Sequence, residues 1–212
     1  MLTTQLDLLD YMEITFAQEK AFNALVYFTQ RIKPLYLTKA IKLLYIADEK
    51  AIKETGVPIT LLNYKAWKYG PVPEDIYNKI KLAHNHQKVG SQEANIDQVI
   101  VSSPPEHLPE GCILEARKEF DDSQFSDYEI EVLDAVIDEY GKYNGEQLVE
   151  VLHEEGSLWH KTVDKNNLQG QFALKSNRSD FVIEFTELLD SDYKKSAFEV
   201  AYQSYLMQAN LI

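Results

Sequence analysis

Cysteine is almost absent from the sequence, since Cys112 is the only one in 212 residues. A single cysteine excludes an internal disulfide and any zinc site built from several cysteines, and it is typical of a reducing compartment. No lysine or arginine precedes Lys20, so the N-terminal stretch lacks the basic region of a secretory signal, and no apolar run approaches the length of a membrane span. We therefore expect a cytoplasmic protein with no membrane partner.

Sequence signatures of catalysis are also absent. There is no nucleophile elbow, P-loop or dinucleotide fingerprint. The run HEEGSLWH begins like a zinc-protease motif, but its second histidine, His160, follows His153 by seven residues instead of four. Cys112 lies in an apolar run without an adjacent base, which is typical of a small buried side chain. We predict no enzyme, no cofactor and no metal site.

Acidic residues are abundant and unevenly placed. The formal net charge is −13; residues 1–90 carry 12 Lys and Arg against 9 Asp and Glu, whereas residues 91–212 carry 9 against 25. Such a field repels nucleic-acid phosphates and attracts basic proteins. The alternative, an acidic surface that only keeps the protein soluble, stays open. Direct binding of nucleic acid is disfavoured.

Apolar residues at helical spacing dominate the chain, and capping residues mark several helix starts. Thr38 is predicted to cap one helix, Ser126 and Glu129 to form a capping box, and Ser179 to cap a later helix. His84 and His86 are interpreted as a solvated helix end. Helices are expected over residues 18–32, 38–52, 73–83, 126–141, 144–156, 179–190 and 193–208.

Two regions depart from the helical pattern. The stretch ITLLNYKAWKY is β-branched and aromatic and leads into a Gly-Pro-Val-Pro turn, so it predicts a short extended segment. Within residues 88–125, NIDQVIVSS and GCILEA are strand-like and are joined by a proline-rich loop, which predicts a β-hairpin or an irregular excursion. The predicted fold is mainly α, one helical domain with a minor β-hairpin or short sheet.

A carboxylate on an apolar helical stripe needs a partner, and Asp48 is such a carboxylate. We expect it to accept hydrogen bonds from a turn, including the amides of the Gly-Pro-Val-Pro corner, or to pair with Lys68; a role as a general base is the disfavoured alternative. The corner lacks the free N–H groups of a phosphate cradle, because Pro71 and Pro73 remove two of them. It is interpreted as a rigid scaffold that begins at Gly70.

The segment KLLYIADEKAIKETGVPITLLNYKAWKYGPVPEDIY, residues 42–77, resembles the signature of the Panacea antitoxin domain family, also called SocA-like or phage-associated GepA-like. A second segment, LVEVLHEEGSLWHKT, residues 148–162, resembles the later part of that family. Ile46 stands where the family usually has an aromatic residue, and Leu61 where it commonly has glycine. The domains we expect are an N-terminal extension (1–17), a Panacea-like helical domain (18–165) and C-terminal helices packed on it (166–212).

The resemblance implies a binding module: an antitoxin of a type II toxin–antitoxin system. It would neutralise a cognate toxin, encoded by the adjacent gene, by direct protein–protein binding. Two alternatives stay open: an adaptor that delivers a client to an ATP-dependent protease, and a hydrolase that uses Asp48 and His153. The N-terminal extension could wrap a partner as an amphipathic arm.

Candidate residues fall into two groups. Exposed tyrosine and tryptophan are favoured interface anchors, although packing in the core is the alternative for Tyr45 and Tyr69. The partner-binding candidates are Tyr45, Tyr64, Trp67, Tyr69 and Trp159. The structural motif consists of Asp48, Gly70, Pro71, Pro73 and His153.

Overall fold

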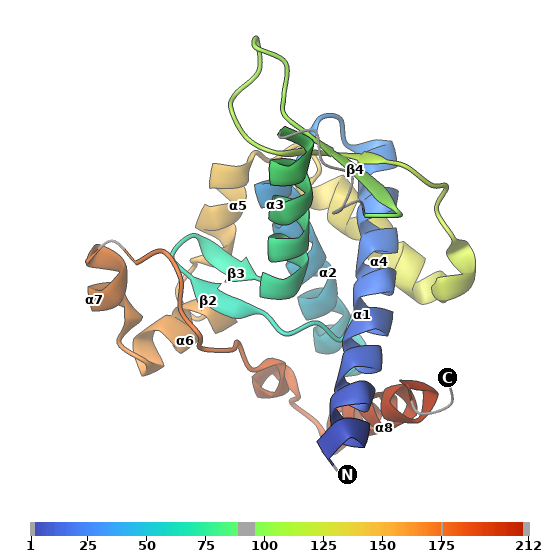
Figure 1. The fold of residues 1–212 in the computed structure, drawn as a ribbon. Coiled ribbons are helices and arrows are strands. Elements are labelled where there is room, and N and C mark those ends of the chain that lie inside the picture. The colour runs from blue at the N-terminus through green and yellow to red at the C-terminus, as the bar shows by residue number, and fades with distance from the viewer. Residues whose placement is uncertain (1–2, 89–95, 175, 210–212) are drawn as a thin grey trace.

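Helix α2 (Leu37–Thr55) is the centre of the fold, and it contacts α1, α3, α4, α5 and α8 (Figure 1). The computed structural model describes residues 3–88, 96–174 and 176–209, and the side chains of residues 17–85, 96–174, 176–204 and 206–207. The apolar stripe predicted for α2 is confirmed, since its residues are buried on nearly all sides. The predicted cap is wrong: the helix starts one residue before Thr38, and Tyr36 is the N-cap without a side-chain hydrogen bond.

Helix α1 (Thr3–Arg31) packs its second half into the core and runs on past the body, where its first half lies beside α8 (Figure 1). The helix predicted from residue 18 is confirmed, and it extends without a break toward the N-terminus. The side chains of the proposed N-terminal arm, residues 1–16, lie outside the described part of the structure. The division into 1–17, 18–165 and 166–212 stays a prediction.

A three-stranded antiparallel sheet covers one end of the helices. Strands β4 (Val99–Ser102) and β5 (Ile113–Ala116) form the predicted hairpin, and β1 (Leu35–Tyr36) pairs with β5, giving the order β1–β5–β4. The long loop between β4 and β5 projects from the body (Figure 1). This sheet buries His84, whose Nε2 lies 3.0 Å from Ser103 Oγ, so its interpretation as a solvated helix end is wrong. The side chain of His86 is outside the described residues.

A second antiparallel pair is formed by β2 (Lys65–Trp67) and β3 (Gly70–Val72), with Trp67 opposite Gly70. The extended segment and turn predicted here are therefore confirmed as a β-hairpin. Helix α3 (Glu74–Lys88) follows at once, and the Pro73 carbonyl accepts its first turn's hydrogen bond from Tyr77 N at 2.9 Å. Pro73 is thus the residue before the first helical position, one place earlier than predicted, and the helix runs on to Lys88, beyond the predicted end at residue 83.

Local capping defines the next two helices. Helix α4 (Asp127–Tyr140) begins at the predicted Ser126–Glu129 capping box, and α5 (Gly145–Leu152) begins at a second box between Asn144 and Gln147. Both boxes satisfy backbone N–H groups that a helix start leaves without partners. Both predicted boxes are confirmed, whereas α5 ends at Leu152, four residues before the predicted end at Gly156.

The last part of the chain contains α6 (Leu158–Lys165), α7 (Leu168–Ala173), a 3-10 turn (Phe185–Leu188) and the predicted final helix, α8 (Asp192–Ala209). The helix predicted to start at Ser179 is wrong. Ser179 is buried and its hydroxyl donates to the Ala66 carbonyl at 2.6 Å, while Val182 forms a β-bridge with Lys65. The segment is extended because the edge of β2 supplies its hydrogen bonds. The molecule is mainly α with a small β component, as predicted.

Candidate partner-binding site

Asp48 fastens the loop before β2 to α2. Its side chain is completely buried, and it accepts hydrogen bonds from Thr60 N at 2.8 Å, Thr60 Oγ1 at 2.5 Å and Tyr64 Oη at 2.6 Å. Burial raises the pKa of Asp48, and these donors oppose the rise because they stabilise the carboxylate. The prediction that Asp48 accepts from a turn is confirmed. The pairing with Lys68 is wrong, since the Lys68 ammonium lies over the Tyr69 ring instead.

The loop that Asp48 holds contains a strained position. Leu61, which stands where the family commonly has glycine, has a left-handed backbone with φ of 56°. Such a conformation costs a non-glycine residue about 1–2 kcal/mol. The turn therefore keeps the backbone shape of a glycine turn, and the contacts around Asp48 hold it.

Lys42 fastens the turn of the β2–β3 hairpin to the same helix. Its side chain is buried, and its ammonium donates to the Tyr69 carbonyl oxygen. Burial lowers the pKa of Lys42 to about 8. The corner is thus held by Lys42, and the prediction that Asp48 binds its amides is wrong.

Gly70 is required in this corner for two reasons. Its φ is +103°, which side chains rarely allow, and a Cβ atom at this position would lie 2.9 Å from Lys42 Nζ. The scaffold role of Gly70 predicted from the sequence thus has a specific partner. Lys42 is the first residue of the segment that resembles the family. Nothing in the sequence, however, indicates that Lys42 and Gly70, 28 positions apart, are in contact.

Trp159 of α6 packs against the β2–β3 hairpin and binds its backbone. Its Nε1 donates to the Trp67 carbonyl at 2.8 Å, and its ring stacks on His153 with centroids 3.5 Å apart and planes 5° from parallel. Burial, followed by the charges of Lys42 and His160, lowers the pKa of His153 to about 4. Residues 42–77 and residues 148–162, the two segments that carry the family resemblance, therefore meet at this hairpin.

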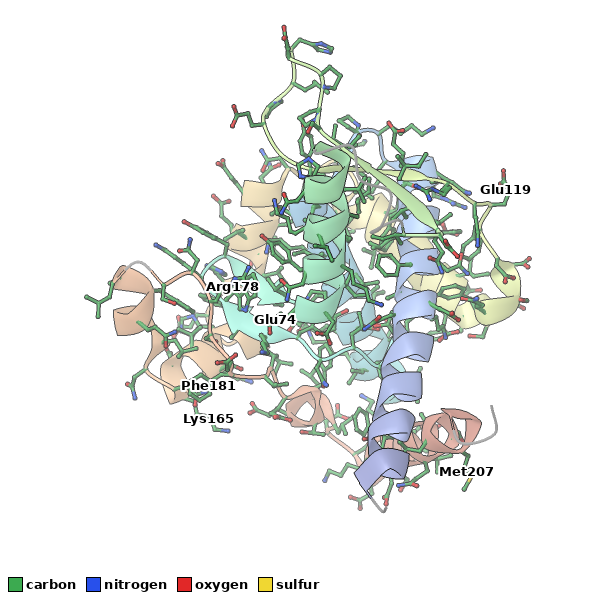
Figure 2. All side chains as sticks on the ribbon, viewed as in Figure 1. Glu74, Glu119, Lys165, Arg178, Phe181 and Met207 are labelled. Carbon is green, nitrogen blue, oxygen red and sulfur yellow. The ribbon has the colours of Figure 1, made fainter. Side chains whose placement is uncertain are left out.

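The outer edge of the hairpin is covered by residues 177–183. Lys68 N donates to the Asn177 carbonyl at 3.0 Å, and the Arg178 guanidinium lies 4.5 Å from the Trp67 ring centroid. Figure 2 shows Arg178 beside Glu74, with Nη1 of the arginine 3.8 Å from the carboxylate. Sequence reasoning missed these contacts, because residues 177–183 lie outside the segments that resemble the family.

The five partner-binding candidates are not alike in exposure. Tyr45, Tyr64, Trp67 and Trp159 are buried, and Tyr45 and Tyr64 pack edge to face with centroids 5.1 Å apart. Tyr69, at the tip of the hairpin, is 55% exposed. Contact with a partner stays a prediction for these residues, and in this fold only Tyr69 presents a large surface for it.

In the part of the chain that the structure describes, no three histidine, cysteine, aspartate or glutamate side chains are grouped to hold a metal ion. No helix within the described ranges has the length and apolar content to cross a membrane. Cys112 is buried, as predicted.

Together these features define a class of protein, a helical scaffold that carries a β-hairpin held by Lys42 and Trp159. Residues 41–160, more than half of the chain, match the family described as "Antitoxin SocA-like, Panacea domain". The chain belongs to this Panacea antitoxin family. Comparisons with curated proteins and with solved structures found no match.

Proposed function

We propose that the chain is the antitoxin of a type II toxin–antitoxin system and that it neutralises a cognate toxin by binding it directly. The observation that carries the proposal is the family match over residues 41–160, which contain the Asp48 and Lys42 contacts and the supporting Trp159. Neutralisation in this form needs a rigid binding surface and no catalysis on the antitoxin.

The negative charge of the chain favours a toxin with a basic surface. Residues 91–212 carry 25 acidic residues against 9 basic ones, and a toxin that acts on RNA or nucleotides presents a basic active surface to its substrate. Attraction between the two fields accelerates encounter and selects partners of the right sign. We propose the product of the neighbouring gene as this toxin.

Co-expression tests the proposal. The neighbouring gene is induced alone, with the wild-type chain, and with a chain that carries Asp48→Ala as a control for folding. We expect growth arrest from the neighbour alone, rescue by the wild-type chain and loss of rescue with the variant. A neighbour that is harmless alone, or arrest that persists with the wild-type chain present, contradicts the antitoxin role.

The amount of toxin separates neutralisation from delivery to a protease. A binding antitoxin protects the toxin, so immunoblots of rescued cells should show an undiminished toxin level and a complex that survives purification. An adaptor would shorten the lifetime of the toxin in cells that contain an ATP-dependent protease and leave it unchanged in cells that lack the protease.

A further inference from the structure

A groove of about 480 Å³ lies between α2 and the C-terminal ends of α4 and α5. Its floor is aromatic and aliphatic, and the wall at Gly156 is open, because a Cβ atom there would meet no atom within 4 Å. Such a floor accommodates the aliphatic stem of a long side chain. The apolar residues that line it are Tyr45, Ile46, Tyr140, Val151 and Leu152.

The rim of the groove carries an excess of negative charge. Five glutamates and two lysines line it, and the lysines are already paired: Lys53 with Glu49 at 2.7 Å and Lys50 with Glu54 at 2.9 Å. Within the described ranges no basic side chain lies at ion-pair distance from the other three glutamates, which are exposed. These three are Glu139, Glu154 and Glu155.

The backbone and side-chain charges inside the groove are negative, like those of the rim. Helix α5 ends on it at Leu152, and the C-terminal end of a helix carries a partial negative charge. Helix α4 also ends there, at Tyr140, but Lys39 Nζ donates to the Gly141 carbonyl at 2.6 Å and offsets the charge of that end. Burial raises the pKa of Tyr140 to about 12, and a hydrogen bond and the charge from Glu139 contribute to the rise. A cation is therefore the complementary occupant.

We propose that this groove binds an arginine side chain presented by the toxin. A guanidinium stacks on a tyrosine ring, donates several hydrogen bonds to carboxylates in a fixed geometry and is weakly hydrated, so it fits a groove with the half-buried Tyr140 on the floor and three uncompensated glutamates on the rim. That the toxin supplies the arginine rests on the proposed function. The groove lies apart from the hairpin tip at Tyr69, none of whose residues lines it.

A peptide probe tests the groove without the toxin. Acetyl-hexaarginine amide is titrated into the isotopically labelled full chain at about 150 mM salt, which screens long-range attraction. We expect backbone amide shifts at residues 139–140 and 154–157, and weaker binding of the hexalysine peptide. The substitutions Glu139→Gln, Glu154→Gln and Glu155→Gln together should lower the affinity about tenfold.

A matched control removes the same charge elsewhere. Glu106→Gln, Glu115→Gln and Glu119→Gln change three exposed glutamates that line no part of the groove, and they should lower the affinity less than about twofold. Figure 2 marks Glu119 on the side of the molecule away from the β2–β3 hairpin. Equal losses in the two triple variants, shifts outside the groove, or no binding of the arginine peptide would overturn the proposal.

The toxin provides a second, separable readout. If the wild-type chain rescues growth and the groove variant rescues equally well at matched expression, the groove proposal fails while the antitoxin role stands. If the wild-type chain fails to rescue, the antitoxin role fails, and the peptide titration still decides whether the groove binds arginine.

Discussion

The two sides of helix α2 differ in how their charges are satisfied. On the inner side, Asp48 and Lys42 are buried and each is bound to a backbone or side-chain group of the β2–β3 region. On the groove side, α2 contributes glutamates and lysines that pair with one another, and it faces three glutamates that have no such pairs in the described structure. The difference separates residues that hold the fold from residues that are available to a partner.

The residues that identify the family thus belong mainly to the inner side. Lys42, Asp48, Gly70 and Trp159 form contacts within the chain, and all four are buried. Toxin recognition is therefore expected at the exposed hairpin tip and at the groove. The following variants test this separation, and they are ordered by the size of the expected effect on stability.

Asp48→Ala should be the most damaging change. It leaves the Thr60 and Tyr64 donors buried without an acceptor, and buried groups that lose a charged partner cost about 3–5 kcal/mol in total. Urea unfolding followed by circular dichroism measures the loss, with Asp48→Asn as the matched variant that keeps one carbonyl acceptor. If the alanine variant loses less than about 1 kcal/mol of unfolding free energy, Asp48 does not hold the fold together.

Gly70→Ala should cost about 2 kcal/mol, since it combines left-handed backbone strain with a collision at Lys42 Nζ. Gly156→Ala is the matched control, because Gly156 has a φ of +85° but no atom within 4 Å of a Cβ atom. Thermal unfolding measures the loss of stability in each variant, and the excess loss in Gly70→Ala over Gly156→Ala gives the cost of the collision with Lys42. Equal losses at both positions would mean that strain alone explains the glycine.

His153 should make stability depend on pH. Its pKa of about 4 in the folded state is below the ordinary value of about 6.5, so the unfolded chain binds more protons between these values. The contribution of neutral His153 is complete above about pH 6.5 and is lost as the pH falls toward 4.

His153→Phe keeps a ring against Trp159 and removes this titration. Between about pH 7 and 4.5 we expect the wild type to lose about 1–2 kcal/mol more stability than the variant, a value reduced because the His153 ring is partly exposed. Urea unfolding across that range measures the difference. Parallel pH profiles for the two proteins would show that His153 is protonated equally in both states.

Tyr69→Ala should change stability least, by at most about 0.5 kcal/mol, because the side chain is exposed and its backbone carbonyl still binds Lys42. If the hairpin tip contacts the toxin, the same variant should weaken binding at least about tenfold. Calorimetric titration with the purified toxin measures this, and Leu82→Ala, also at an exposed apolar residue, serves as the control. Unchanged affinity would remove Tyr69 from the interface.

Local signals explain what the sequence could predict. The capping boxes at Ser126 and Asn144 and the proline before α3 act within a few residues, so they mark helix starts without knowledge of the tertiary fold. The need of Asp48 for donors also followed from a local pattern, because a carboxylate on an apolar stripe must be bound.

The errors arose where distant segments meet. Ser179 is a residue type that suits a helix N-cap, but hydrogen bonds to β2 make residues 179–183 extended. His84 is buried by a hairpin that follows it by nearly twenty residues. The bond from Lys42 to the Tyr69 carbonyl has no signal in either residue type alone. Each outcome depends on tertiary packing, which overrides local propensity.

The most direct test of the account is an inhibition titration of the purified toxin with the purified chain, followed by separation of the two proteins. We expect a stable complex, loss of toxin activity at a fixed molar ratio, and recovery of intact, active toxin once the chain is removed. Toxin that stays active in the presence of excess chain, or that is recovered cleaved or modified, would contradict neutralisation by direct binding.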